Sequence, residues 1–334
     1  MMTNQARFGT LHAILLLVCA VVLCLPGNPK AANVKLDFTL DWTIYGTHAP
    51  FYLALDKGFY VQEGIDVSIA EGQGSATVTQ ILAGGRIPIG YIDYATMAQG
   101  VVQGVPVKAI FGVTQTSPMA VISHAESPIK TAKEMEGKVL AMAPAESTAQ
   151  IFPALVAAAG VDANKISIIN PAVGAKNALF LQNRADAIVG YSQLQTVQLE
   201  DQGAKVYYFK YADFGVNTLS NGIAVNSDFL SKNGDLVRRF LRATAKAWAV
   251  ALKDPGGAVD AIVRIRPELK DKKNMLLRQL ELTFPLLSTL NTKGKPLGWM
   301  AKKDWEETQE ILSKYANLKK TIPAEQYFTN DYIP

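Results

Sequence analysis

Hydrophobic and polar residues alternate along residues 34–40 and again along residues 65–69. Strict alternation places every second side chain on one face of an extended chain, so both segments are predicted to be β-strands. Between them the first strand breaks at Asp41, a short loop follows, and Pro50 opens a helix that ends at Gly58. Together these elements form a βαβ unit. Small molecules bind beyond the carboxyl ends of strands in such sheets, so we expect residues 41–48 to lie at a binding site.

The same order of strands and helices continues to about residue 226. Further strands are predicted at residues 88–91, 107–113, 119–123, 139–142, 166–169, 187–189, 206–209 and 221–226. Repeating strands and helices are typical of an α/β fold with helices on the faces of its sheets. The remaining chain is almost entirely helical, with helices predicted at residues 228–230, 236–252, 255–265, 273–284 and 302–315. Such a helical run needs a sheet to cover, and we expect it to cover the first one.

A change of pattern near Gln115 and a second near Asn221 divide the chain into two lobes. Residues 33–116 and 222–334 are predicted to form lobe I, and residues 117–221 are predicted to form lobe II. The two crossings between the lobes would act as a hinge. A chain of 334 residues is long enough for two domains of ordinary size.

The first 32 residues are predicted to be a signal peptide rather than part of the fold. Arg7 supplies a positive start, residues 13–25 are apolar, and Ala31 and Ala32 are small residues suited to cleavage. Both cysteines, Cys19 and Cys24, lie inside this segment, so the mature chain would have no thiol for a disulfide, a metal site or a nucleophile. An exported, cysteine-free protein of this size indicates a bacterial periplasm.

The charge balance argues against a nucleic-acid partner. The formal net charge is +4, and removal of residues 1–32 takes away two positive charges and no acid, which leaves +2. The mature chain keeps two histidines, His48 and His124, which are too few for a metal cluster. No Gly-x-Ser-x-Gly elbow or P-loop is present. We therefore expect no metal, no cofactor and no catalytic site.

Ligand-type side chains gather at the strand ends of lobe I. Trp42 and Tyr45 can sandwich a flat ring, a contact worth about 0.5–1.5 kcal/mol beyond burial, and His48 can donate to or accept from a ring nitrogen. The alternative for Trp42 and Tyr45 is that they only pack the top of the sheet, and the alternative for His48 is a helix-capping or surface imidazole. The other candidates in this lobe are Gly74 and Ser75 in a glycine-rich turn, Tyr91, Asp93 and Tyr94 near the third strand, and Gln115 at the first crossing. Asp93 can either accept from an exocyclic amine or cap the helix that follows it.

Lobe II offers Ser147 and Thr148 at a helix N-terminus, where hydroxyls, backbone N–H groups and the helix dipole suit an anion or a carbonyl group. Ordinary helix capping is the alternative. Tyr191 and Gln193 follow the strand at residues 187–189 and should face the cleft. Asn221, at the second crossing, could reach the ligand or only the hinge backbone.

Three segments carry a resemblance to a known family: DWTIYGTHAPFYLALDKGFYVQEGIDVSI, EGQGSATVTQILAGGRIPIGYID and SPIKTAKEMEGKVLA. They resemble the periplasmic solute-binding proteins of ABC importers, in the branch shared by thiamine-pyrimidine-precursor binders and by nitrate, taurine and alkanesulfonate binders. The resemblance covers essentially the whole mature chain. It implies a type II fold of two lobes, each a mixed sheet flanked by helices, which closes on a small-molecule ligand and delivers it to an inner-membrane ABC permease. We also expect a monomer.

The ligand stays open between two classes. The ring side chains favour a small polar heterocycle, such as a thiamine pyrimidine precursor, whereas the hydroxyls at the helix N-terminus favour an anion such as an alkanesulfonate, taurine or nitrate. The pyrimidine-binding relatives tend to place an aromatic residue and a carboxylate near the position of Tyr191. Here Ser192 and Gln193 follow that tyrosine, so Asp93 would have to supply the acid.

Two further readings concern the class of protein. Fungal pyrimidine synthases share the fold that the resemblance implies, but the mature chain lacks their cysteine-rich iron motif, and we therefore do not expect an enzyme. A periplasmic sensor that presents its ligand to a membrane receptor would fit the same residues as an importer component.

Overall fold

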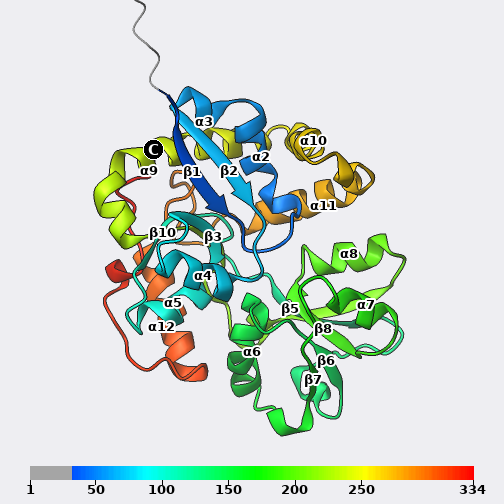
Figure 1. The fold of residues 1–334 in the computed structure, drawn as a ribbon. Helices are drawn as coiled ribbons and strands as arrows, with labels where there is room; N and C mark the ends of the chain where they lie inside the picture. The colour runs from blue at the N-terminus through cyan, green and yellow to red at the C-terminus, as the bar shows by residue number, and fades with distance from the viewer. Residues whose placement is uncertain (1–31) are drawn as a thin grey trace, which may run out of the picture. The chain divides into compact units, whose positions relative to one another are not determined.

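Two five-stranded β-sheets organise residues 32–334, the part of the chain that the computed structural model describes (Figure 1). The predicted signal peptide, with Cys19 and Cys24, lies outside the described residues apart from Ala32. Each sheet mixes parallel and antiparallel strand pairs and has helices packed against it. The prediction of an α/β fold with two mixed sheets is therefore confirmed.

The first sheet has the strand order β2-β1-β3-β10-β4. β1 pairs in parallel with β2 and β3, whereas β10 runs antiparallel to β3 and β4. Its strands are β1 (Val34–Thr39), β2 (Ile65–Ala70), β3 (Ile89–Asp93), β4 (Val107–Gly112) and β10 (Asn221–Asn226). All five residues of β3 are buried, as expected for a strand with neighbours on both edges and helices on its faces.

The second sheet has the order β7-β6-β8-β5-β9. β6 is parallel to β7 and β8, and β5 is antiparallel to β8 and β9. Its strands are β5 (Met119–His124), β6 (Val139–Ala141), β7 (Ser167–Ile169), β8 (Ala187–Tyr191) and β9 (Val206–Lys210). Alternate residues of β5 pack on opposite faces: Val121 belongs to the main core, and Ile122 belongs to a smaller cluster that includes Phe180.

Helices cover both sheets. Those in the chain segments of the first sheet are α2 (Ala49–Asp56), α3 (Phe59–Gln62), α4 (Ser75–Ala83), α5 (Tyr94–Val101), α9 (Ser227–Ala251), α10 (Pro255–Ile265), α11 (Lys273–Thr283) and α12 (Lys302–Tyr315). Those between the strands of the second sheet are α6 (Ser147–Ala158), α7 (Lys176–Leu181) and α8 (Gln195–Asp201). α9 and α10 pack against α2, so the C-terminal helices cover the first sheet as predicted (Figure 1). Within residues 32–334 there is no helix that combines the length and the apolar character needed to cross a membrane.

Element bounds match the sequence-based expectations where the apolar periodicity is long. β10, α10 and α12 begin and end at the predicted residues. The two helices expected within residues 228–252 meet at a kink within α9, where Asn233 has non-helical torsion angles (φ −129°, ψ 29°). The gap between the two predicted segments, residues 231–235, contains this kink.

The chain passes from the first sheet to the second between β4 and β5, and it returns between β9 and β10. Asn221 is the first residue of β10 and pairs with Asp93 in the first sheet, one residue outside the lobe predicted to contain it. The division of the chain into lobes that move about these two crossings remains a prediction.

Tyr94, one of the predicted ligand residues, stabilises the first sheet. The register between β10 and β4 shifts between Ile223 and Ala224. At this irregularity the Tyr94 hydroxyl donates to the carbonyl oxygens of Phe111 (2.7 Å) and Ile223 (2.9 Å). Gly222 makes room for the hydroxyl, since a Cβ there would lie 2.1 Å from it. The buried hydroxyl thus ties β4 to β10 at the point where their register shifts.

We predict that Tyr94→Phe lowers the free energy of unfolding by about 1–3 kcal/mol, because the buried hydrogen bonds of its hydroxyl to two carbonyl groups are lost. Urea denaturation measures this loss. Tyr315→Phe serves as the control, since Tyr315 is only half-buried, and it should change stability by less than about 0.5 kcal/mol. An unchanged unfolding free energy in Tyr94→Phe would contradict this role.

Candidate ligand-binding site

A cavity of about 30 Å³ lies where strand ends of the two sheets meet. From the first-sheet side it is lined by loops after β1 and β2, and from the second by the start of α6 and the end of β8. The lining residues are Asp41, Trp42, Gly74, Ser75, Glu146, Ser147, Thr148, Gly190, Tyr191, Leu194 and Gln195. The carboxyl ends of parallel strands are where α/β sheets bind small molecules. In its present form the cavity has room for only one or two water molecules.

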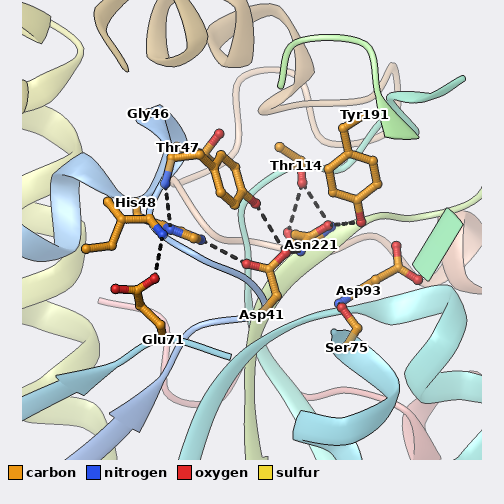
Figure 2. Close-up of polar contacts among 12 residues, drawn as sticks. Asp41, Gly46, Thr47, His48, Glu71, Ser75, Asp93, Thr114, Tyr191 and Asn221 are labelled. Carbon is orange, nitrogen blue, oxygen red and sulfur yellow. Dashed lines mark hydrogen bonds and ion pairs between the residues drawn. The ribbon is translucent and has the colours of Figure 1, made fainter. Parts of the chain in front are cut away.

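A chain of hydrogen bonds crosses from one sheet to the other beside this cavity (Figure 2). The Asn221 amide Nδ2 donates to Oδ2 of Asp41 (2.7 Å), and the Tyr191 hydroxyl donates to Oδ1 of Asn221 (2.6 Å). The hydroxyls of Ser147 and Tyr191 lie 2.5 Å apart. Asp41 and Asn221 belong to the first sheet and its loops, whereas Tyr191 and Ser147 belong to the second.

The donor and the acceptor in each of these hydrogen bonds follow from the chemistry of the side chains. An ionised carboxylate only accepts hydrogen bonds, so Asn221 turns its N–H toward Asp41 and its oxygen toward Tyr191. Tyr191 then uses its single proton on Asn221, and Ser147 must donate to the tyrosine oxygen. Burial, followed by the charges of Asp93 and Asp41, raises the pKa of the Tyr191 hydroxyl well above its ordinary value, which keeps that proton in place. The walls of the cavity therefore present acceptor lone pairs on Asp41 and Ser147.

Tyr45 and His48 hold Asp41 from behind. The Tyr45 backbone N–H donates to His48 Nδ1 (3.3 Å), which leaves the proton on Nε2, and Nε2 donates to Asp41 Oδ1 (2.9 Å). The Tyr45 hydroxyl donates to Asp41 Oδ2 (3.2 Å). Both ring side chains are almost fully buried, 1% and 0% exposed. In this conformation they are buried and orient the carboxylate, and neither lines the cavity.

Glu146 and Lys176 form a buried ion pair at the other wall of the cavity. Lys176 Nζ donates to Glu146 Oε2 and to the Val189 carbonyl oxygen (2.6 Å). The same Nζ lies 5.8 Å from the centre of the Trp42 ring, which is a cation–π contact between the two sheets' loops. Burial raises the pKa of the Glu146 carboxyl despite the neighbouring ammonium group.

Asp93 divides its two carboxylate oxygens between two roles. Oδ1 accepts from the Thr96 backbone N–H (2.7 Å) and hydroxyl (2.8 Å) and so caps α5. Oδ2 is buried and has no hydrogen-bond partner among the described residues. Burial is the main cause that raises the pKa of this carboxyl from 3.8 to about 6. Capping is therefore established, and an acceptor for a ligand N–H remains a prediction.

Six of the fourteen predicted ligand residues line the cavity: Trp42, Gly74, Ser75, Ser147, Thr148 and Tyr191. The other eight do not line it in this conformation: Tyr45, His48, Tyr91, Asp93, Tyr94, Gln115, Gln193 and Asn221. Gln115 donates its side-chain N–H to the Leu287 carbonyl (3.0 Å) beside a separate surface hollow, and Tyr91 and Gln193 are buried. Ligand contact stays a prediction for all fourteen.

Five lining residues were not predicted: Asp41, Glu146, Gly190, Leu194 and Gln195. Asp41 and Glu146 each stand directly before nominated residues, so the strand-end rule that selected Trp42 and Ser147 would have reached them one position earlier. Gln195 had no such signal in the sequence. The turn after β8 brings it to the cavity, where its Oε1 accepts from the Tyr191 backbone N–H (2.6 Å). Within the described part of the chain, no three His, Cys, Asp or Glu side chains are grouped to hold a metal ion.

The sequence was compared with models of known protein families. Residues 46–258, more than half of its length, match the family model described as NMT1/THI5 like. The chain belongs to the NMT1/THI5-like family. Among relatives, it is 27% identical to the riboflavin-binding protein RibY of Chloroflexus aurantiacus, over 86% of this chain and 82% of that protein. It is 23% identical to a formylaminopyrimidine-binding protein of Halalkalibacterium halodurans, over 88% and 89% of the two chains.

This NMT1/THI5-like chain also has relatives that are enzymes. A 4-amino-5-hydroxymethyl-2-methylpyrimidine phosphate synthase of Legionella pneumophila is 21% identical over 90% of this chain and 92% of that protein. Among solved structures, the alkanesulfonate-binding protein SsuA of Xanthomonas axonopodis pv. citri superimposes with a TM-score of 0.68 at 12% identity, covering 90% of this chain and 98% of that one. At this identity the likeness shows the fold alone, which is that of a solute-binding protein.

We predict that Asp93→Asn flattens the pH dependence of stability. The unfolded carboxyl has its ordinary pKa of 3.8, and the folded one has a pKa of about 6. The buried protonated form stabilises the fold fully below pH 3.8, and this stabilisation is lost as the pH rises through about 6. The loss amounts to up to about 3 kcal/mol, and asparagine removes it because it does not titrate.

Chemical denaturation between pH 4 and 7 measures this effect. Asp66→Asn, which removes an exposed carboxylate from β2, is the control. Parallel curves for the wild type and Asp93→Asn would show that the carboxyl does not titrate in this range.

Proposed function

We propose that this protein is the periplasmic solute-binding component of an ABC importer, and that it captures a flat nitrogen heterocycle whose ring carries N–H groups. Thiamine pyrimidine precursors are the first candidates, and flavins are the second. The observation that carries the proposal is the cavity between the two sheets, with acceptor groups on Asp41 and Ser147 and the Trp42 ring at its wall. Amino and ring N–H groups are the donors that such walls require, and an indole face suits a flat ring.

The relatives support the same class of ligand. RibY and the formylaminopyrimidine-binding protein are both named for nitrogen heterocycles, and each aligns with most of this chain. Their names also favour a binding protein over an enzyme. The pyrimidine phosphate synthases keep an enzymatic role as the competing reading.

An anionic ligand has less support. The N-terminus of α6 would attract an anion, but the same cavity is lined by the carboxylates of Asp41 and Glu146. No lysine or arginine is among the residues that line it, and the ammonium group of Lys176 is already paired with Glu146. A sulfonate or nitrate would therefore meet negative charge without a free cation to balance it.

Capture requires the two sheets to separate and close again. A cavity of about 30 Å³ is far below the 300–1,000 Å³ of ordinary ligand sites. The polar contacts between the two sides include the Tyr191–Asn221 hydrogen bond, a bond from the Ala76 N–H to the Ala145 carbonyl (3.2 Å) and an exposed ion pair between Arg278 and Glu200 (2.7 Å). The Gln279 side-chain N–H also donates to the Leu194 carbonyl (3.3 Å), and Lys176 lies over the Trp42 ring. Opening must break these contacts. Opening about the two crossings would expose the lining groups to a ligand. The protein, as a monomer, would then close on the ligand and deliver it to the permease.

We predict that pyrimidines or flavins bind and raise the melting temperature, whereas taurine, alkanesulfonates and nitrate do not. Calorimetry and thermal shift with this panel measure both quantities. Trp42→Ala should weaken heterocycle binding at least about tenfold by removing the stacking surface. Trp299→Ala, a tryptophan that does not line the cavity, is the matched control. A large shift with a sulfonate alone removes the heterocycle proposal, and turnover of a bound pyrimidine would restore the enzymatic reading.

We predict that Gly74→Ala hinders closure. Gly74 has φ +106°, and a Cβ there would lie 2.3 Å from the Ala145 carbonyl oxygen on the other side of the cavity. Gly85 also has positive φ (+66°) but nothing within 4 Å of a Cβ, so Gly85→Ala is a matched control for backbone strain. Gly85→Ala should lose about 1 kcal/mol of stability, and Gly74→Ala should lose at least as much, because its backbone lies at φ +106°, ψ 144° and its Cβ meets the Ala145 carbonyl. Only Gly74→Ala should bind ligand at least about tenfold more weakly by calorimetry. Equal affinities in the two variants would contradict closure at Gly74.

A further inference from the structure

Trp42 separates the inner cavity from a second, larger hollow. This outer groove has a volume of about 430 Å³, and its lining comes mainly from α7, α8 and the start of α11. Its lining residues are Trp42, Thr43, Gly174, Lys176, Asn177, Ala178, Gln195, Gln198, Asp201, Gln202, Lys272 and Met275. Trp42 and Gln195 line both spaces, so the groove adjoins the ligand cavity at these two side chains.

The polar lining of the groove is dominated by side-chain amides. Asn177, Gln195, Gln198 and Gln202 all face it, and Thr43 adds a hydroxyl. Asn177 Nδ2 donates to Gln198 Oε1 (2.9 Å), while Asn177 Oδ1 is buried with no hydrogen-bond partner among the described residues. An amide both donates and accepts, and so does a hydroxyl group. A run of amides therefore matches a run of hydroxyls better than it matches an apolar chain.

The charges of the groove favour a neutral occupant over a phosphate. Lys176 is bound to Glu146 and to the Val189 carbonyl, which leaves Lys272 as the unpaired cation among the lining residues. The carboxylate of Asp201 lines the same groove and would repel an anion. No arginine is among the residues that line it, although arginine is the side chain best suited to bind phosphate through two hydrogen bonds.

We propose that the outer groove is a subsite for a neutral hydroxylated chain attached to the ring that occupies the inner cavity. The junction of ring and chain would lie at Trp42, and Asn177 and Gln198 would bind the hydroxyl groups. This subsite rests on the proposed capture of a heterocycle and narrows its ligand to rings that carry a polyol chain.

Three flavin probes test the subsite. Lumichrome has the ring without the chain, riboflavin adds a ribityl chain, and flavin mononucleotide adds a phosphate to that chain. Titration with flavin fluorescence should show riboflavin binding at least about tenfold more tightly than lumichrome, and flavin mononucleotide binding more weakly than riboflavin.

Two variants of similar size, Asn177→Leu and Gln198→Met, should reduce riboflavin affinity toward that of lumichrome and leave lumichrome affinity unchanged. Gln182→Met, at the far end of α7 and outside the groove lining, is the control. Melting temperatures establish that each variant is folded. If one groove variant does not fold, the other alone is enough to test the subsite.

Equal affinities for lumichrome and riboflavin, or tighter binding of flavin mononucleotide, would overturn the subsite and leave heterocycle capture standing. Failure of all three flavins would also overturn it. The pyrimidine arm of the ligand panel then shows whether the proposed function stands without the subsite.

Discussion

The carboxylate of Asp41 is the group on which the arrangement of the site depends. It is 5% exposed and accepts hydrogen bonds from His48, Tyr45 and Asn221. A buried carboxylate is costly unless its oxygens are satisfied in this way. The loop after β1 folds back to bring His48 and Tyr45 to it, and β10 brings Asn221 from almost two hundred residues further along the chain.

The acceptor character of Asp41 then sets the polarity of everything connected to it. Asn221 is oriented by the carboxylate, Tyr191 by Asn221, and Ser147 by Tyr191. One carboxylate in the loop after β1 therefore determines which atoms Tyr191 and Ser147 present to the cavity. Such chains are stronger together than singly. They also make the site selective. A ligand that enters must supply hydrogen-bond donors, and its contacts must replace those that hold the two halves together.

Much of the fold follows from local patterns in the sequence. The short apolar run of β10, which is buried on both faces, and the helical periodicity of α10 and α12 predict their bounds. The strand-end rule also reaches Trp42, Ser75, Ser147 and Tyr191. It could not separate the rings that face the cavity from those that pack behind it. Tyr45 and His48 turn inward to donate to Asp41, and Tyr94 turns inward to donate to the carbonyls of Phe111 and Ile223. Both reasons are tertiary and have no signal in a single sequence.

The movement of the two halves around a ligand is tested most directly by a distance measurement. Cysteines introduced at the exposed positions Lys57 and Arg184, with Cys19 and Cys24 replaced by serine, would carry spin labels on the two sides of the cavity. Pulsed electron paramagnetic resonance should show a broad set of distances without ligand and one shorter, narrow distance with the heterocycle that binds most tightly. The same distribution with and without ligand would contradict capture by closure.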